Sequence, residues 1–311
     1  MIDGPDRGRT RPWHSRAARR AASLLHDILP YGRRSDAAVQ ILRFVARHGR
    51  LPNRTGYSDI LLRRLIAADN RGGLRQAITD KIEVKSYVAG RIGADHVVPT
   101  IAVYDAPEQI DLAALPDDCC IKPSHMSGAF AFRRNGGPVD LDEVATWFDA
   151  DYYRMSREGN YAGLRPRVMV EPLIFGRESP WDYKFVCSGG RVRFIHLNLA
   201  QRPVARRVLT DRAFRQLPFA LADGEAAPAP APPSNLARMI DIAERLSAGF
   251  DFVRVDLYTD GEEIRFGELT NVPFAGMNPV MGPDGERALA EAVFGAAHEG
   301  RRVETGAVPA S

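Results

Sequence analysis

The most suggestive residues for chemistry are two acids, Asp256 and Glu268, in the segment FVRVDLYTDGEEIRFGELTN (residues 252–271). Apolar residues on both sides of Asp260-Gly261 predict two strands joined by a tight turn. The two acids lie about equally far from that turn, so antiparallel pairing would bring them together. Two adjacent carboxylates repel each other unless a cation lies between them. The alternative is that both acids lie on a solvated face of the hairpin.

Lysine is rare in this chain and confined to its middle. Of the 42 basic side chains only four are lysines: Lys81, Lys85, Lys122 and Lys184. Arginine presents a wide planar fork, whereas lysine carries a compact charge on a slim stem, which fits between phosphate oxygens in a narrow site. Codon bias explains the rarity of lysine but not the positions of these four. We expect Lys85 on the exposed side of its helix.

Two further segments suggest a nucleotide site. In KPSHMSGAF, Lys122 ends a short strand, and Ser127 and Gly128 lie in a loop whose backbone N–H groups suit a phosphate. An ordinary hairpin turn would look the same. In RVMVEPLIFGRES a strand becomes irregular at Glu171-Pro172, where free backbone groups suit a purine, and Glu178 follows as an acceptor for ribose hydroxyls.

The surrounding elements predict an α+β chain. Residues 36–69 read as two amphipathic helices, and a further helix begins near Asp80 and ends at Gly93. Strands follow at 97–104, 119–122, 130–134 and 167–174, with a helix at 139–153. A hairpin turns at Gly189-Gly190, and the helix 235–247 leads into the acidic hairpin. We predict a basic, flexible segment at 1–35, a helical extension at 36–79, an α+β domain at 80–297 with an Ala/Pro linker at 222–234, and a flexible tail at 298–311.

Composition narrows the class of protein. The 311 residues are 45% hydrophobic, enough for a sizeable core, and no apolar run is long enough for a membrane span or a secretory signal. We therefore expect a cytoplasmic protein. Its formal charge of +3 does not favour nucleic acid. The first 34 residues hold eight arginines and three acids, which suit either a solvated tail or peripheral contact with an anionic surface. Three cysteines give neither a disulfide framework nor a metal spacing.

In this order, DKIEVKSYV, IKPSHMSG, VEPLIFGRES, DYKFVCSGG, FVRVDLY and FGELTNVPFAG resemble the ATP-grasp superfamily, and most closely its TupA-like branch, named for teichuronopeptide biosynthesis. The resemblance covers roughly residues 50–283. It implies an ATP-grasp fold, in which two α+β subdomains close on ATP, here preceded by a helical extension in place of the usual nucleotide-fold domain. It also implies Mg²⁺ or Mn²⁺ as cofactor.

The resemblance implies a role for each matching residue. Lys81, Lys122 and Lys184 would serve ATP binding, with Ser127 and Gly128 in the loop over the phosphates. Glu171, Pro172, Leu173 and Ile174 would face the adenine, and Glu178 would bind the ribose. Asp256 and Glu268 would hold the metal, completed by either Thr270 or Asn271, and Arg254 would stabilise charge on the transferring phosphoryl group.

The activity implied is an ADP-forming ligase that activates an acceptor carboxylate as an acyl phosphate and joins it to an amine or thiol. Arg202, Arg206 and Arg207 are candidates for holding the acceptor, although a solvated arginine cluster is as good an interpretation. A kinase with the same ATP site and a non-catalytic nucleotide-binding protein are the alternatives. The family name suggests cell-surface polymer (polysaccharide) biosynthesis, and a peptide natural-product pathway fits equally well. Acceptor, nucleophile and oligomeric state are open.

Overall fold

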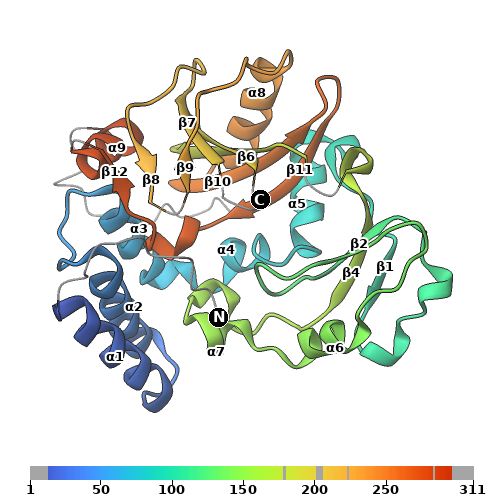
Figure 1. Cartoon of the computed structure of the whole chain (residues 1–311), viewed down its shortest axis with the longest axis horizontal. Coiled ribbons are helices and arrows are strands. Elements are labelled where there is room, and N and C mark those ends of the chain that lie inside the picture. The colour runs from blue at the N-terminus through green and yellow to red at the C-terminus, as the bar shows by residue number, and fades with distance from the viewer. Residues whose placement is uncertain (1–12, 178–179, 201–205, 223, 283, 296–311) are drawn as a thin grey trace.

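The computed structural model describes residues 13–177, 180–200, 206–222, 224–282 and 284–295. Two larger, mostly antiparallel sheets, a small two-stranded sheet, a group of N-terminal helices and further helices along the chain make up this part of the chain (Figure 1). The helices are α1 (Trp13–Ile28), α2 (Arg33–His48), α3 (Tyr57–Leu65), α4 (Gly73–Ala77), α5 (Glu83–Ile92), α6 (Leu141–Asp149), α7 (Tyr152–Ser156), α8 (Leu236–Ser247) and α9 (Gly285–Phe294). No helix among the described residues is long and apolar enough to cross a membrane.

The smaller sheet forms one lobe. Its strands are β1 (Ala102–Tyr104), β2 (Cys119–Pro123), β3 (Ala131–Arg133) and β4 (Val168–Pro172), in the order β1-β4-β2-β3. Apolar residues of β2 and β4 pack with Val144 and Trp147 of α6 to form its core. The short buried run CCIK therefore became the central strand β2, as the sequence predicted.

The larger sheet carries most of the buried apolar residues. Its order is β11-β10-β5-β6-β7-β9, and its strands are β5 (Asp182–Ser188), β6 (Arg191–Ala200), β7 (Arg206–Asp211), β9 (Glu225–Ala226), β10 (Phe252–Thr259) and β11 (Ile264–Thr270). Only the β7–β9 pair is parallel among the described strands. A small separate pair joins β8 (Ala220–Leu221) to β12 (Val280–Met281).

Strand alternation gives the larger sheet two different faces. In β10, Val253, Val255 and Leu257 point into the core formed with α5 and α8. On the opposite face Phe252 packs with residues of α3 and α9. Arg254 and Asp256 follow Phe252 on that same face, beyond the part covered by α3 and α9. The face is thus apolar at one end and charged at the end nearer the smaller lobe.

The helical pair α1–α2 is joined to α7 through a buried arginine. Arg157, which is 1% exposed, donates to the carbonyls of Pro30 (3.1 Å) and Leu29 (2.8 Å) and to Asp36 Oδ1 (3.1 Å). Its guanidinium carbon also lies 4.0 Å from the centre of the Tyr31 ring. A buried guanidinium needs this many acceptors, because an unpaired charge in the interior is strongly unfavourable. Arg157 therefore fixes the end of α1 against the lobes.

The sequence predicted many of the elements, but β7 and α9 were not predicted, and β9 lies in the segment predicted as a linker. Within the segment 1–35 that was predicted to be flexible, residues 13–28 form the helix α1, and residues 1–12 lie outside the described residues. The expected helix 139–153 is two helices, because the Asp151 side chain accepts from the Arg154 N–H and begins α7. The predicted tail 298–311 also lies outside the described residues, and the domain boundaries remain predictions.

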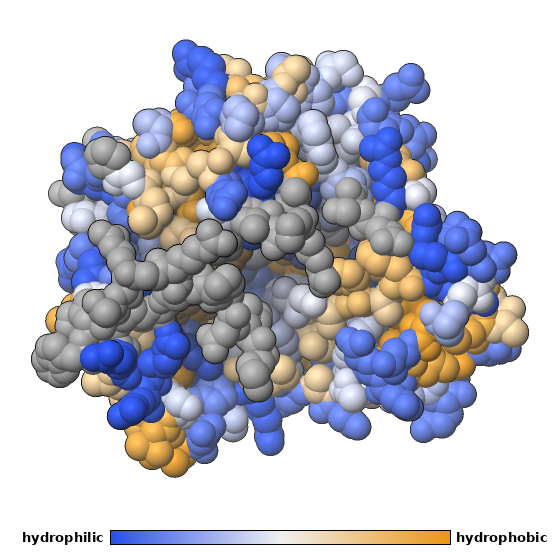
Figure 2. All heavy atoms as spheres, in the orientation of Figure 1, coloured by the Kyte–Doolittle hydropathy of each residue, from blue (hydrophilic) through white to orange (hydrophobic). Residues whose placement is uncertain are grey.

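Hydrophobic side chains also reach the surface of the helical pair. Figure 2 shows an orange patch at the lower left, over the end of the α1–α2 pair. Leu24 and Ile28 of α1 are 60% and 62% exposed. The patch is small, and hydrophilic residues surround it in this view.

Replacing Arg157 should weaken the whole fold. Arg157→Gln leaves Asp36 Oδ1 and several carbonyls without their donor, and we expect a loss of about 3–5 kcal/mol in the free energy of unfolding. Arg154→Gln is the matched control, because the Arg154 side chain is 68% exposed and pairs only at the surface, so we expect a change within about 1 kcal/mol. Urea denaturation followed by circular dichroism measures both. Equal, small losses would contradict the role given to Arg157.

Candidate active site

One row of three charged side chains and a buried histidine crosses four strands of the larger sheet. Asp256 on β10 lies opposite Glu268 on β11 and opposite Lys184 on β5, and Lys184 lies opposite His196 on β6. Cross-strand partners share a face, so all four side chains start from the charged end of one face. The prediction that the hairpin brings Asp256 and Glu268 together is confirmed. The solvated alternative is wrong for Asp256, which is 1% exposed.

The cation between the two acids is Arg254. Its Nε and Nη2 atoms donate to Asp256 Oδ1 (2.6 Å) and Oδ2 (2.7 Å), and the same Nη2 donates to Glu268 Oε1 (2.5 Å). Lys184 Nζ donates to Asp256 Oδ2 (2.6 Å) and also pairs with Asp182. Arg254 Nη1 makes no hydrogen bond to any described residue. One guanidinium therefore joins two strands and keeps a donor for another group.

These contacts keep Glu268 charged. Burial opposes its ionisation, but Arg254, Lys184 and Lys81 outweigh that effect and lower the pKa of Glu268 to about 2. Burial raises the pKa of Asp256, and the charges of Arg254 and Lys184 oppose that shift. Because Asp256 accepts three hydrogen bonds from two cations, we treat it as ionised at neutral pH.

A cavity of about 110 Å³ lies between the two sheets, beside this row. Lys81, Lys85 and Lys122 line it together with Glu171, and Tyr258, Gly267 and Glu268 of the β10–β11 hairpin line it as well. Lys85 Nζ and Lys122 Nζ each lie 2.5 Å from a different oxygen of Glu171. We call this space the lysine cavity. Two ammonium groups thus pair with Glu171, and with Lys81 the three lysines outnumber the two glutamates that line the cavity, Glu171 and Glu268.

Lys85 was expected on the exposed side of its helix, and that prediction is wrong. Its side chain is 17% exposed and donates to Val98 O (2.7 Å) and Thr100 Oγ1 (2.5 Å) besides the pair with Glu171. The reason is tertiary: Val84 and Val88 pack against the larger sheet, so the neighbouring side of α5 faces β4. Lys85 is therefore a site residue that sequence reasoning missed.

The loop after β2 lies close to Lys81. Lys81 Nζ donates to the carbonyl of Met126 (2.5 Å), and its backbone N–H donates to Ser124 O (3.0 Å). Burial lowers the pKa of Lys81 to about 8. Ser127 and Gly128 are exposed at the tip, and Gly128 has the positive φ of 84° that glycine permits. The loop is accessible, with a fixed lysine at its base.

The segment proposed to face the adenine lies at the rim of the lysine cavity. Glu171 and Pro172 end β4, and Leu173 leads into the short helical turn η6 (Ile174–Gly176). Glu171 and Ile174 line the cavity, whereas Leu173 is buried. The Glu171 side chain is bound to lysines, and Lys122 and Lys85 lower its pKa against the effect of burial. A ligand in this cavity would therefore meet the backbone of 172–174 more readily than the Glu171 carboxylate.

Thr270 and Asn271 occupy different environments. Thr270 Oγ1 donates to Glu268 Oε1 (2.9 Å). Asn271 is buried on another side, where its Nδ2 donates to Arg75 O (2.8 Å) and Thr79 Oγ1 (3.0 Å) and its Oδ1 accepts from Arg75 (3.2 Å). All three bonds join Asn271 to the segment that contains α4 and Thr79. The Thr270 hydroxyl therefore lies beside Glu268, whereas the Asn271 side chain is held by Arg75 and Thr79.

Asp256 and Glu268 could bind a divalent cation that takes its remaining ligands from water or phosphate. The Glu268 side chain is 42% exposed, and its Oε2 accepts no hydrogen bond from the described residues. Asp256 Oδ1 accepts only from Arg254, so it retains a lone pair. Within the described ranges no group of three or more His, Cys, Asp or Glu side chains could hold a metal. A cation here would take two carboxylates and fill its shell with water or phosphate, as Mg²⁺ does.

The remaining predicted residues are only partly placed. Glu178 and Arg202 lie outside the described residues. Arg206 is exposed at the start of β7. Arg207 lies opposite Asn198 of β6, and its guanidinium carbon is 5.4 Å from the centre of the Phe274 ring. Asn198 in turn lies opposite Asp182, so Arg207 continues the charged face away from the lysine cavity.

Two hairpin residues were not recognised from the sequence. Tyr258 lies two residues after Asp256, so strand alternation alone would have placed its side chain on the same face. Gly267 occurs where the pairing register shifts between Asp256 and Leu257. A Cβ at Gly267 would lie 2.7 Å from Cε2 of Tyr258, so no other residue fits without movement of that ring. Gly267 thus lets Tyr258 and Glu268 line one cavity.

Comparisons with known proteins give one family and several solved structures. A sequence profile described as TupA-like ATPgrasp matches residues 62–292. No curated protein matches the chain. Among solved structures, the ATP-grasp ligase PsnB with its minimal precursor is 15% identical, with a TM-score of 0.37, and the match covers 71% of this chain and 61% of PsnB.

Two other solved structures are similarly distant. D-cycloserine synthetase DcsG is 18% identical with a TM-score of 0.36, and 70% of each chain is covered. D-alanine-D-alanine ligase from Helicobacter pylori is 12% identical with a TM-score of 0.39, and the match covers 70% of this chain and 59% of the ligase. The chain thus spans less than two thirds of PsnB and of the Helicobacter pylori ligase.

The different positions of Thr270 and Asn271 predict different mutant stabilities. Asn271→Ala leaves buried donors and acceptors around Arg75 and Thr79 unpaired, and we expect a loss of about 1–3 kcal/mol in the free energy of unfolding. Thr270→Val removes one bond to a half-exposed carboxylate, so we expect a loss of about 1 kcal/mol or less. Chemical denaturation of both variants tests this. A larger loss for Thr270→Val would reverse the assignment.

Proposed function

Because the chain belongs to the TupA-like ATP-grasp family, we propose that it is an ATP-dependent, ADP-forming ligase. It would activate an acceptor carboxylate as an acyl phosphate and join it to an amine or thiol. The observation that carries the proposal is the lysine cavity, where three lysines lie opposite Glu268, next to Asp256 and Arg254. Cations on one wall and carboxylates on the other suit a nucleoside triphosphate with its bound metal ion.

The lysines are the proposed phosphate ligands. Lys81 and Lys122 were expected in this role, and the position of Lys85 adds a third. Each ammonium is compact enough to share a cavity of about 110 Å³ with the others. The backbone of Pro172, Leu173 and Ile174 at the rim would face the adenine. The loop with Ser127 and Gly128 would cover the phosphates. Lys184 is placed to fix Asp256 rather than to contact ATP directly.

Asp256 and Glu268 are the proposed ligands of Mg²⁺ or Mn²⁺. When bound, such a cation neutralises charge on the phosphate oxygens. The chain's part is to keep both carboxylates ionised and in place, which Arg254, Lys184 and the Thr270 hydroxyl accomplish. In this arrangement the acids are positioned before any cation binds. The metal site is thus built by ion pairs.

Arg254 is the proposed catalytic residue for phosphoryl transfer. Two of its nitrogens are fixed by Asp256 and Glu268, so its guanidinium cannot turn freely. The third, Nη1, donates to no described residue and can bind an oxygen of the transferring group. A fixed donor stabilises developing charge without reorganisation at the moment of reaction.

The acceptor is proposed to bind along the face that continues to Arg207. Arg207 on β7 lies two strands from Asp182 on β5. Arginine can bind a carboxylate through two parallel hydrogen bonds. Arg202 and Arg206 belong to the same stretch of sequence. A carboxylate acceptor fits this surface better than a neutral alcohol, which favours a ligase over a kinase. Amino acids, peptides and uronic acids are the classes to test.

Trapping of the acyl phosphate decides between ligase and kinase. We expect a carboxylate acceptor, supplied with Mg-ATP and hydroxylamine but without its amine, to give a hydroxamate, with free phosphate released in step with ADP. Pools of amino acids, peptides and uronic acids are screened by the colour of the ferric hydroxamate.

The Arg254→Lys variant should react at least about tenfold more slowly, because lysine lacks the guanidinium fork.

A stable phosphorylated acceptor, with ADP formed but neither hydroxamate nor free phosphate, would establish the kinase instead. Binding of ATP without any turnover across these pools would favour a nucleotide-binding protein.

The lowered pKa of Lys81 predicts how nucleotide affinity depends on pH. Below its pKa of about 8 the ammonium is charged and attracts phosphate, and above it the charge is lost. Affinity for a non-hydrolysable ATP analogue should therefore fall by up to about tenfold per pH unit above pH 8. Binding near pH 8 should take up a proton, because phosphate raises the pKa of Lys81.

Isothermal titration calorimetry in buffers of different ionisation enthalpy measures that proton. In Lys81→Met both the pH dependence and the proton uptake should disappear. An affinity that stays constant between about pH 7 and 9.5 in the wild type would contradict this role.

A further inference from the structure

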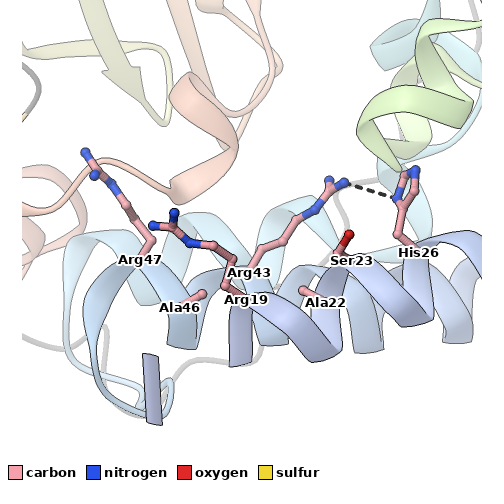
Figure 3. A pocket seen from close by; sticks show the side chains of 7 residues that line it. All are labelled: Arg19, Ala22, Ser23, His26, Arg43, Ala46 and Arg47. Carbon is pink, nitrogen blue, oxygen red and sulfur yellow. Dashed lines mark hydrogen bonds between the residues drawn. The ribbon is translucent and has the colours of Figure 1, made fainter. Parts of the chain in front are cut away.

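A second and larger cavity lies on the helical pair, away from the lysine cavity. It has a volume of about 340 Å³, and all the described residues that line it belong to α1 and α2 (Figure 3). We call it the arginine pocket, after Arg19, Arg43 and Arg47. Ala22 and Ala46 are small and buried, which leaves room between the longer side chains. Its volume lies within the range of small-molecule sites.

The described lining is cationic. Arg19, Arg43 and Arg47 contribute three guanidinium groups, His26 and Ser23 contribute polar atoms, and among the described residues no Asp or Glu lines the pocket. Figure 3 shows these side chains extending from the same side of the helix pair. Three like charges around one space repel each other. An anion between them would remove that repulsion.

Only part of the donor capacity of these arginines is used within the protein. Arg43 donates to the carbonyls of Ser156 and Met155 and to His26 Nδ1 (3.1 Å). Arg47 donates through Nε to Met277 O (3.0 Å), and its terminal nitrogens donate to no other described residue. Arg19 makes no hydrogen bond or ion pair with any residue that the structure describes. Packing accounts for Arg43 but not for the forks of Arg19 and Arg47.

Two arginines of the pocket bind segments that connect to the candidate active site. Arg43 holds the end of α7, whose first residue Tyr152 interacts with Ser127 of the phosphate loop. Arg47 binds the carbonyl of Met277. Met277 comes directly after η7 (Pro273–Gly276), which follows the end of β11. A ligand in the pocket would contact the same arginines that fix these two segments.

We propose that the arginine pocket binds a small soluble molecule carrying carboxylate or phosphate groups. Arginine forks bind both groups through paired, charge-assisted hydrogen bonds. The site is separate from the lysine cavity and shares no residue with it. The proposal does not depend on the ligase activity.

Calorimetry with citrate and inorganic phosphate as probes tests the pocket in the full chain carrying Lys122→Met, which removes one phosphate ligand of the other site. Adding Arg19→Gln with Arg47→Gln should weaken binding of citrate at least tenfold. The matched control is Arg16→Gln with Arg20→Gln: the same charge is removed from exposed positions on α1 that do not line the pocket. We expect the control to bind as tightly as its parent.

Circular dichroism confirms that each variant is folded, and Arg19→Gln alone serves if the double variant is not. ATP affinity of the Arg19/Arg47 variant in the otherwise wild-type chain should be unchanged, which separates this site from the catalytic one. Failure of both probes to bind, or equal weakening in the control, would overturn the proposal. Arginine-dependent binding to phosphatidylglycerol vesicles without binding of either soluble probe would overturn it in favour of a lipid headgroup.

Discussion

The guanidinium of Arg254, held between Asp256 and Glu268, is the contact on which the rest of the candidate site depends. Without it two carboxylates on adjacent strands would repel each other and open the hairpin. With Lys184 and Asp182 included, three carboxylates face two cations, so one negative charge remains uncompensated. Such a cluster is stable in itself and still attracts a divalent cation.

The lysine cavity has the opposite charge balance. Lys85 and Lys122 pair with one carboxylate, Glu171, and Lys81 lies beside them, which leaves excess positive charge opposite Glu268. An anionic ligand with a bound cation would complete both sides at once. All four lysines of the chain belong either to this cavity or to the adjacent ion pairs, which they share with Arg254. Their compact ammonium groups explain that selection, since guanidinium forks would not share so small a space.

The sequence predicted what depends on local periodicity and missed what depends on packing. The position of the turn and the alternation in β10 were enough to predict that Asp256 and Glu268 lie near each other on one face, whereas the bulge at Gly267, which sets their pairing, was not predicted. Lys85 was misplaced because the sheet and β4 together decide which side of α5 is buried. Thr270 and Asn271 could not be distinguished, since only the position of Arg75 and Thr79 shows where the Asn271 side chain binds. The arginine pocket needs two helices side by side and had no signal in either alone.

Lysine labelling in the presence and absence of Mg-ATP tests the central claim most directly, that the lysine cavity binds the nucleotide. With only four lysines, amine acetylation can be followed at every site by mass spectrometry. The account predicts that a non-hydrolysable Mg-ATP analogue slows modification of Lys81, Lys85 and Lys122 together, and that the Arg19/Arg47 variant shows the same protection. Unchanged labelling of all three lysines at saturating nucleotide would contradict it.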